Sequence, residues 1–170
     1  MQWYELIFVL IDMRSFSNLW YWIGLAVMWS SVSHWVMGVP FDMITRARRH
    51  GGEAGDDLAT LSRISASRLL YISRNAGIWV IAFTCFLITL LGLLAIVYDI
   101  EFAQAVLLLF APMVLVGYLS LRTALKVETE ALTGDALIRR LLRHRFQVQL
   151  IGMLSIFVTA MFGMYQNLAY

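Results

Sequence analysis

The sequence is poor in the residue types that build metal centres and disulfides. Its 170 residues include one cysteine, Cys85, and three histidines. A single thiol allows neither an internal disulfide nor a pair of Cys-x-x-Cys metal clamps. We therefore expect no metal ion and no cofactor.

Motifs that carry a reaction are also missing. The chain has no Gly-rich phosphate loop, no HExxH and no pair of carboxylates within its apolar segments. Ser30 and Ser31 lie near His34, but no acid is placed to orient the imidazole and no oxyanion donor is evident. We therefore expect that the protein is not an enzyme.

Charge is scarce as well. Only 14% of the residues are charged and 61% are hydrophobic, whereas a typical soluble domain has roughly 25% charged residues. A soluble chain of this length could not bury so much apolar surface. The composition predicts an integral membrane protein with one domain, residues 1–170.

Four stretches carry no charge and are long enough to cross a bilayer. About 20 apolar helical residues cover about 30 Å of hydrocarbon, and a helix satisfies its own backbone hydrogen bonds in lipid. The prediction is an all-α, antiparallel bundle of four transmembrane helices. The predicted spans are about 16–38, 76–98, 102–121 and 147–167.

The basic residues predict the orientation. Twelve of the thirteen lie in the connections after the first and third spans, and only Arg14 lies on the other side. The positive-inside rule places the basic side in the cytoplasm and both termini outside. We expect a multi-pass protein of the bacterial inner membrane, with residues 1–14 as an interfacial helix on the outer surface.

Helical extensions of the spans are expected to form a cytoplasmic stem from residues 56–75 and 122–146. Each helix carries an apolar stripe there: Leu58, Leu61, Ile64, Leu69 and Ile72 in the first; Leu121, Leu125 and Leu132 in the second. Arg68 and Glu128 fall within these stripes, at about 10–12 Å beyond the ends of their spans. We therefore predict an ion pair between Arg68 and Glu128.

Two spans carry polar faces. One lies in the first span and one in the fourth: Ala26, Ser30, Ser33, His34 and Met37 in the first; Gly152, Ser155, Thr159, Gly163 and Gln166 in the fourth. Such faces either pack against other helices through small residues or line a water path, and His34 could also bind a ligand. We favour packing.

Arginines cluster beside the membrane on the cytoplasmic side: Arg46, Arg48, Arg49, Arg139, Arg140, Arg143 and Arg145. Such clusters meet anionic lipid headgroups or serve as topology determinants. No nucleic-acid partner is expected, because the segment has no recognisable fold for reading bases.

Three stretches near the N-terminus carry a family resemblance: residues 11–22 (IDMRSFSNLWYW), 29–35 (WSSVSHW) and 38–43 (GVPFDM). They resemble small membrane proteins of Rhodobacter-type alphaproteobacteria, some labelled "component of SufBCD complex". That label implies iron–sulfur assembly. Cluster ligation takes several thiolates, so the resemblance implies docking to a soluble complex rather than holding a cluster.

Two functions are compatible with these features. The first is a structural or accessory membrane protein that self-associates, or docks a partner complex through its basic cytoplasmic hairpin. The alternative is a subunit of an oligomeric ion pore, lined by the polar face of the first or fourth span.

Overall fold

The computed structural model describes residues 15–169, which are helical almost throughout. The elements are η1 (Ser15–Ser17), α2 (Leu19–His34), β1 (Trp35–Val36), β2 (Val39–Pro40), α3 (Phe41–His50), α4 (Gly52–Ile96), α5 (Glu101–Thr129) and α6 (Gly134–Ala169). The all-α prediction is confirmed, apart from the short hairpin β1–β2. The interfacial helix expected in residues 1–14 lies outside the described residues.

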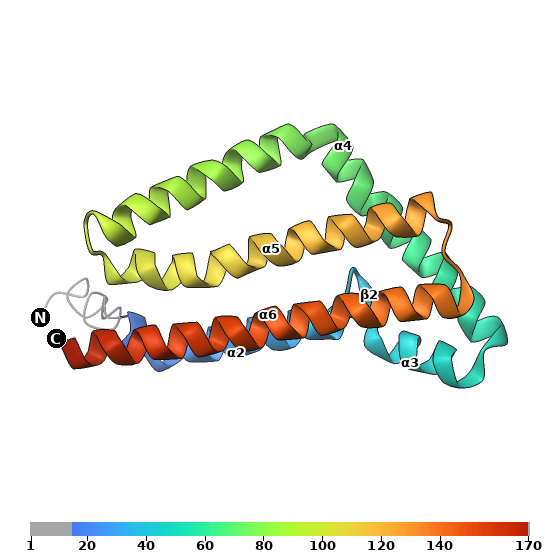
Figure 1. Ribbon diagram of the computed structural model, residues 1–170, viewed down its shortest axis with the longest axis horizontal. Helices are drawn as coiled ribbons and strands as arrows, with labels where there is room; N and C mark the ends of the chain where they lie inside the picture. The colour runs from blue at the N-terminus through green and yellow to red at the C-terminus, as the bar shows by residue number, and fades with distance from the viewer. Residues whose placement is uncertain (1–14, 170) are drawn as a thin grey trace, which may run out of the picture.

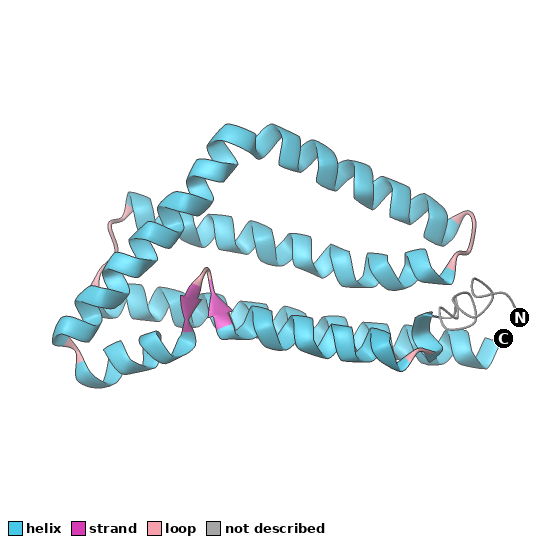
Figure 2. Ribbon diagram, turned by 180° about the vertical axis from the view of Figure 1, so that it is seen from behind, coloured by secondary structure: helices cyan, strands magenta, loops and turns pink. Residues whose placement is uncertain are grey.

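The long helices alternate in direction (Figure 1). α2 and α5 run one way, while α4 and α6 run the other, and the same arrangement is visible from behind in Figure 2. The start of α2, the end of α6 and the α4–α5 turn therefore lie at one end, here called the terminal end (Figure 1). α3 and the α5–α6 turn lie at the other, called the stem end.

Three helices in the described part of the chain are long and apolar enough to cross a membrane: α4, α5 and α6. This is consistent with a multi-pass membrane protein. α2 has 16 residues and is therefore about 24 Å long, shorter than the predicted first span at 16–38.

α2 ends before residue 38, the predicted end of the first span, because the chain turns at Met37 and Gly38. Their φ values are 54° and 80°, the left-handed backbone of a tight hairpin turn. The turn pairs Trp35 with Pro40 and Val36 with Val39. Pro40 then leads into α3, so this proline belongs to a hairpin rather than to a simple helix end.

α3 is an amphipathic helix laid against α4 and α6 at the stem end. Ile44 and Ala47 are buried, while its arginines are exposed. Gly51 and Gly52 follow, with φ values of 59° and 49°, a conformation that glycine adopts at little steric cost. α4 thus begins at Gly52, slightly before the expected start at residue 56.

The best-packed part of the protein is the stem. Its core joins the β1–β2 hairpin and α3 to the first half of α4, the end of α5 and the start of α6. Further along, α4 stands apart: only 6% of its most apolar stretch is buried, against 22% in α5 and 28% in α6. Ile78 and Trp79 are 84% and 78% exposed.

Candidate functional site

The buried face of α4 in the stem follows a spacing of four residues. Leu58, Ser62, Ala66 and Leu70 are all 2% exposed or less. Ile64 and Ile72, which the apolar pattern placed inside, are 49% and 54% exposed. Small side chains at positions 62 and 66 allow α4 to approach its neighbours closely, so the larger isoleucines turn outward.

The ion pair of the stem also differs from the one expected from the sequence. Glu128 pairs with Arg74, at 2.7 Å between Arg74 Nη2 and Glu128 Oε2, and not with the expected Arg68. Arg74 continues the four-residue spacing one turn beyond Leu70. Arg68 lies about 160° around the helix from Leu70 and is exposed.

Replacing Arg74 by glutamine is expected to lower the free energy of unfolding only slightly. The arginine side chain is 63% exposed, and exposed pairs contribute about 0–1 kcal/mol. Thermal unfolding in detergent, followed by circular dichroism, measures the change. Arg68→Gln is the matched control, and a larger loss with that variant would contradict the assignment.

A buried histidine lies where α5 meets α6. His144 is 2% exposed, three residues before the predicted fourth span. Its Nε2 lies 3.3 Å from Ser120 Oγ and its Nδ1 lies 3.2 Å from Thr123 Oγ1. Desolvation by burial, and then the charge of Arg140, lower the pKa of His144 from 6.5 to about 4, so the ring is neutral at pH 7.

The hydrogen bonds around His144 select one tautomer. Ser120 donates its hydroxyl proton to the carbonyl of Val116, at 2.9 Å, so its oxygen accepts from Nε2–H. Arg140 donates to Thr123 Oγ1, at 3.4 Å, which leaves the Thr123 hydroxyl to donate to Nδ1. Both ring nitrogens are occupied, so the histidine serves as a polar link between α5 and α6.

Sequence reasoning missed His144 as a structural residue because it lies within the run of arginines. The signal was its spacing: Leu137, Leu141, His144 and Val148 share one face of α6, and all are buried. Among the described residues, no group of three or more His, Cys, Asp or Glu side chains is arranged to hold a metal ion.

The polar face of α6 points into the bundle. Ser155 and Thr159 are 8% and 0% exposed. A Cβ on Gly152 would lie 2.9 Å from the Trp29 ring, and one on Gly163 would lie 3.1 Å from the Phe16 ring. The two glycines thus make room for aromatic rings from α2 and η1, which is the packing role expected of small residues.

The polar face of α2 points away from the bundle. Ser30 and His34 are exposed and Ser33 is half-buried, because Leu25 and Trp29 occupy the side of α2 that contacts the bundle. The two predicted polar faces therefore do not meet inside one protomer. His34 makes an edge contact with Trp35, at 6.0 Å between ring centroids.

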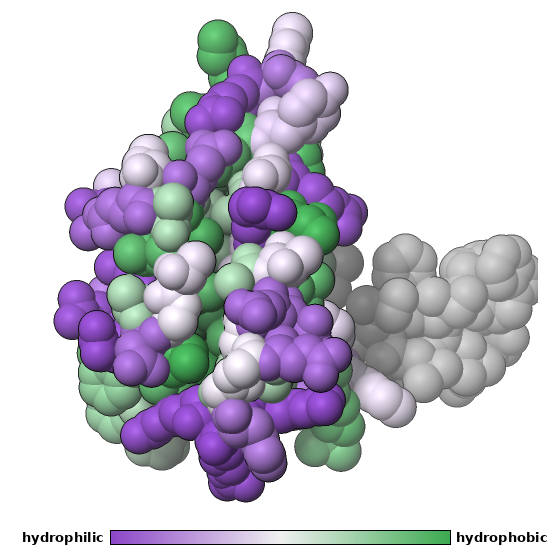
Figure 3. Space-filling view, turned by 90° about the vertical axis from the view of Figure 1, so that its right-hand side faces the viewer, coloured by the Kyte–Doolittle hydropathy of each residue, from purple (hydrophilic) through white to green (hydrophobic). Residues whose placement is uncertain are grey.

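The seven clustered arginines divide into two groups. Arg140 and Arg145 are partly buried; Arg140 donates to Thr123, and the Arg145 guanidinium carbon lies 3.3 Å from the centre of the Phe41 ring, a cation–π contact. The other five are exposed and form no ion pair within residues 15–169: Arg46, Arg48, Arg49, Arg139 and Arg143. Figure 3 shows hydrophilic side chains gathered over this stem end.

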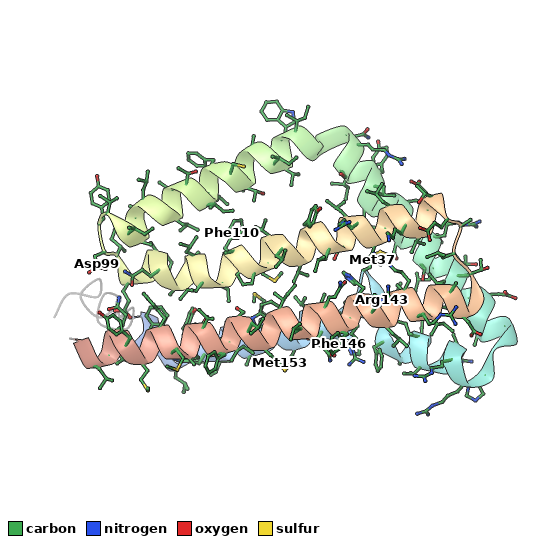
Figure 4. All side chains as sticks on the ribbon, in the orientation of Figure 1. Met37, Asp99, Phe110, Arg143, Phe146 and Met153 are labelled. Carbon is green, nitrogen blue, oxygen red and sulfur yellow. The ribbon has the colours of Figure 1, made fainter. Side chains whose placement is uncertain are left out.

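At the terminal end, uncharged and acidic side chains form hydrogen bonds between the elements. Gln104 donates to Asp99 Oδ1 at 2.7 Å and to the carbonyl of Ala95 at 3.0 Å, and Gln166 donates to Gln104 Oε1. Glu101 accepts from the backbone N–H of Phe16 at 2.8 Å. Figure 4 labels Asp99 at this end and Arg143 toward the stem. Within residues 15–169 every Arg and Lys lies in segment 46–74 of α3 and α4 or in segment 122–145 of α5 and α6, and Asp99 and Glu101 are the charged residues of the α4–α5 turn.

No family model, curated protein or solved structure matches this chain.

Proposed function

We propose that the protein is a structural or accessory protein of the bacterial inner membrane that docks a partner complex through its basic stem. One observation carries this proposal: five exposed arginines on α3 and α6 project from a well-packed stem without acidic partners among the described residues. Fixed, unneutralised positive charge suits an acidic protein surface, with anionic headgroups beside it.

The proposed topology has four crossings, with the stem in the cytoplasm and both termini outside. The alternating direction of α2, α4, α5 and α6 supports it (Figure 1). α2 is short for a bilayer of about 30 Å, but η1 and the β1–β2 hairpin extend the chain at its two ends. The charge difference between the stem end and the terminal end agrees with the positive-inside rule.

Packing also favours this proposal over an ion pore. Trp29 and Phe16 cover the polar face of α6 at Gly152 and Gly163, and Ser155 and Thr159 between them are buried, which disfavours a water path along the fourth span within one protomer. The outward face of α2, with Ser30 and His34 exposed, suits contact with a second copy, because polar groups on membrane helices prefer protein to lipid. A pore would need several copies around that face.

Site-specific photo-crosslinking in native membranes tests the docking proposal. A crosslinking residue at His50, which is exposed on the basic stem, is expected to capture one discrete soluble partner. Tyr98, 69% exposed at the opposite end, is the matched control and is expected to give no such adduct.

Removing positive charge from the stem distinguishes docking of a partner from non-specific crosslinking. Replacing Arg48, Arg49, Arg139 and Arg143 together by glutamine is expected to reduce the His50 adduct at least about tenfold, since each charge near an anionic surface contributes about 1 kcal/mol. Adducts with lipid or with the chain itself alone, or an adduct that survives this substitution, would rule the proposal out.

A further inference from the structure

An apolar groove runs between α4 and α5, along the part of α4 that diverges from the rest of the bundle (Figure 1). Its volume is about 540 Å³, and Ile72, Gly77, Ile81, Val114, Gly117 and Tyr118 are among the residues that line it. Figure 1 shows α4 diverging from α5 along this stretch. Within the predicted spans 76–98 and 102–121, the groove lies along the halves that are nearer the stem.

Two glycines keep the groove open. A Cβ on Gly117 would meet nothing within 4 Å, and one on Gly77 would meet only Ser73 Oγ, at 3.8 Å. No protein side chain of the described residues fills this space. An occupant in a bilayer must therefore be apolar, and its shape must fit a channel between two helices.

The stem-side mouth of the groove is positively charged. The Arg122 guanidinium carbon lies 5.8 Å from the centre of the Tyr118 ring, which itself lines the groove. Arg68 lies one helical turn before Ile72 and is exposed. Arg74 is paired with Glu128, whereas Arg122 and Arg68 form no ion pair within residues 15–169, so these two supply the unpaired charge.

We propose that this groove binds a single anionic phospholipid, with an acyl chain between α4 and α5 and its phosphate on Arg122. The combination of an apolar channel and a guanidinium at one mouth matches the two parts of such a lipid. Arginine binds phosphate oxygens through charge-assisted hydrogen bonds. This site is separate from the arginines of α3 and α6, so it does not depend on the docking proposal.

Native mass spectrometry of the purified protein, titrated with phosphatidylglycerol or phosphatidylethanolamine in detergent, tests this site. The wild-type protein is expected to bind one phosphatidylglycerol about fivefold more tightly than phosphatidylethanolamine, as expected for one arginine at an anionic headgroup. Arg122→Gln is expected to remove that preference, whereas Arg63→Gln, at an exposed position of α4 that does not line the groove, is expected to keep it.

Filling the groove gives the second arm of the test. Gly117→Leu places a side chain in the channel and is expected to abolish the first tight binding event for both lipids. Gly92→Leu is the matched control, because position 92 is equally unobstructed and does not line the groove. Circular dichroism confirms that both variants remain helical.

Three results would overturn the proposal. The first is equal affinity for the two lipids in the wild-type protein. The second is lipid binding that Gly117→Leu or Arg122→Gln leaves unchanged in a folded protein. The third is a wild-type dimer that Gly117→Leu converts to a monomer, which would assign the groove to a second copy of the chain.

Discussion

Lowering the pH from 6.5 to 4 is expected to destabilise the wild-type protein, and His144→Gln is expected to remove much of that loss. The folded protein holds the pKa of His144 at about 4, below its ordinary value of 6.5. Between these two pH values the unfolded chain binds a proton at this histidine and the folded chain does not. Stability therefore falls as the pH falls through this window.

The size of the expected loss of stability follows from the pKa shift of His144. One pKa unit corresponds to 1.36 kcal/mol, so the full contribution is about 3 kcal/mol at pH values below the folded pKa. Unlike an exposed group, His144 is 2% exposed and is little screened by solvent. Glutamine preserves a polar side chain for Ser120 and Thr123 but does not titrate.

Thermal unfolding in detergent at pH 7, 6, 5 and 4 measures this difference. Carboxyl groups also titrate in the range, so the informative quantity is the gap between wild-type and variant curves. His50→Gln, at an exposed position on α3, is the control and is expected to follow the wild-type curve. Parallel curves for wild type and His144→Gln would contradict the described environment of His144.

Replacing Gly152 by leucine is expected to destabilise the bundle by about 1–3 kcal/mol or more, the cost of overpacking a filled core. The Cβ alone would lie 2.9 Å from the ring of Trp29, so either α2 or the indole must move. Even Gly152→Ala is expected to be harmful, although alanine ordinarily stabilises a helix relative to glycine.

Gly92 provides the comparison, because a Cβ there meets nothing within 4 Å. Gly92→Leu is expected to unfold at or above the wild-type temperature. A double variant, Gly152→Leu with Trp29→Ala, is expected to be less destabilised than the sum of its single changes, since the smaller residue at 29 relieves the clash. Equal losses at positions 92 and 152 would show that α2 does not pack on α6.

Periodicity and hydropathy were sufficient to predict the long helices. The predicted spans at 76–98, 102–121 and 147–167 fall within or almost within α4, α5 and α6, because a bilayer-spanning helix needs only length and apolar composition. The first span was harder. The turn at Met37–Gly38 depends on left-handed backbone conformations, and a hydropathy count does not register them.

The choice of buried face was less predictable than the helices themselves. In the stem, hydrophobicity favoured Ile64 and Ile72, whereas the fold buries Ser62 and Ala66, because close helix approach rewards small side chains. The same reasoning explains why Arg74, not Arg68, meets Glu128. His144 lies among arginines in the sequence, and only its burial in the folded protein lowers its pKa.

The polar faces show what a single helix pattern can and cannot determine. Gly152, Ser155, Thr159 and Gly163 share one face of α6 by their spacing, and that face is buried. The equivalent stripe of α2 is outside. Its direction depends on which face of α2 offers the better packing surface, and Trp29 provides that surface.

Substituted-cysteine labelling in intact cells tests the proposed four-crossing topology most directly. In a Cys85→Ala background, Ser17→Cys and Tyr98→Cys are expected to react with a membrane-impermeant maleimide added outside. His50→Cys and Thr133→Cys are expected to react only after the cells are permeabilised. Labelling of both Ser17→Cys and His50→Cys from outside would mean that α2 does not cross the membrane, and outside labelling of Thr133→Cys would place the basic stem on the wrong side.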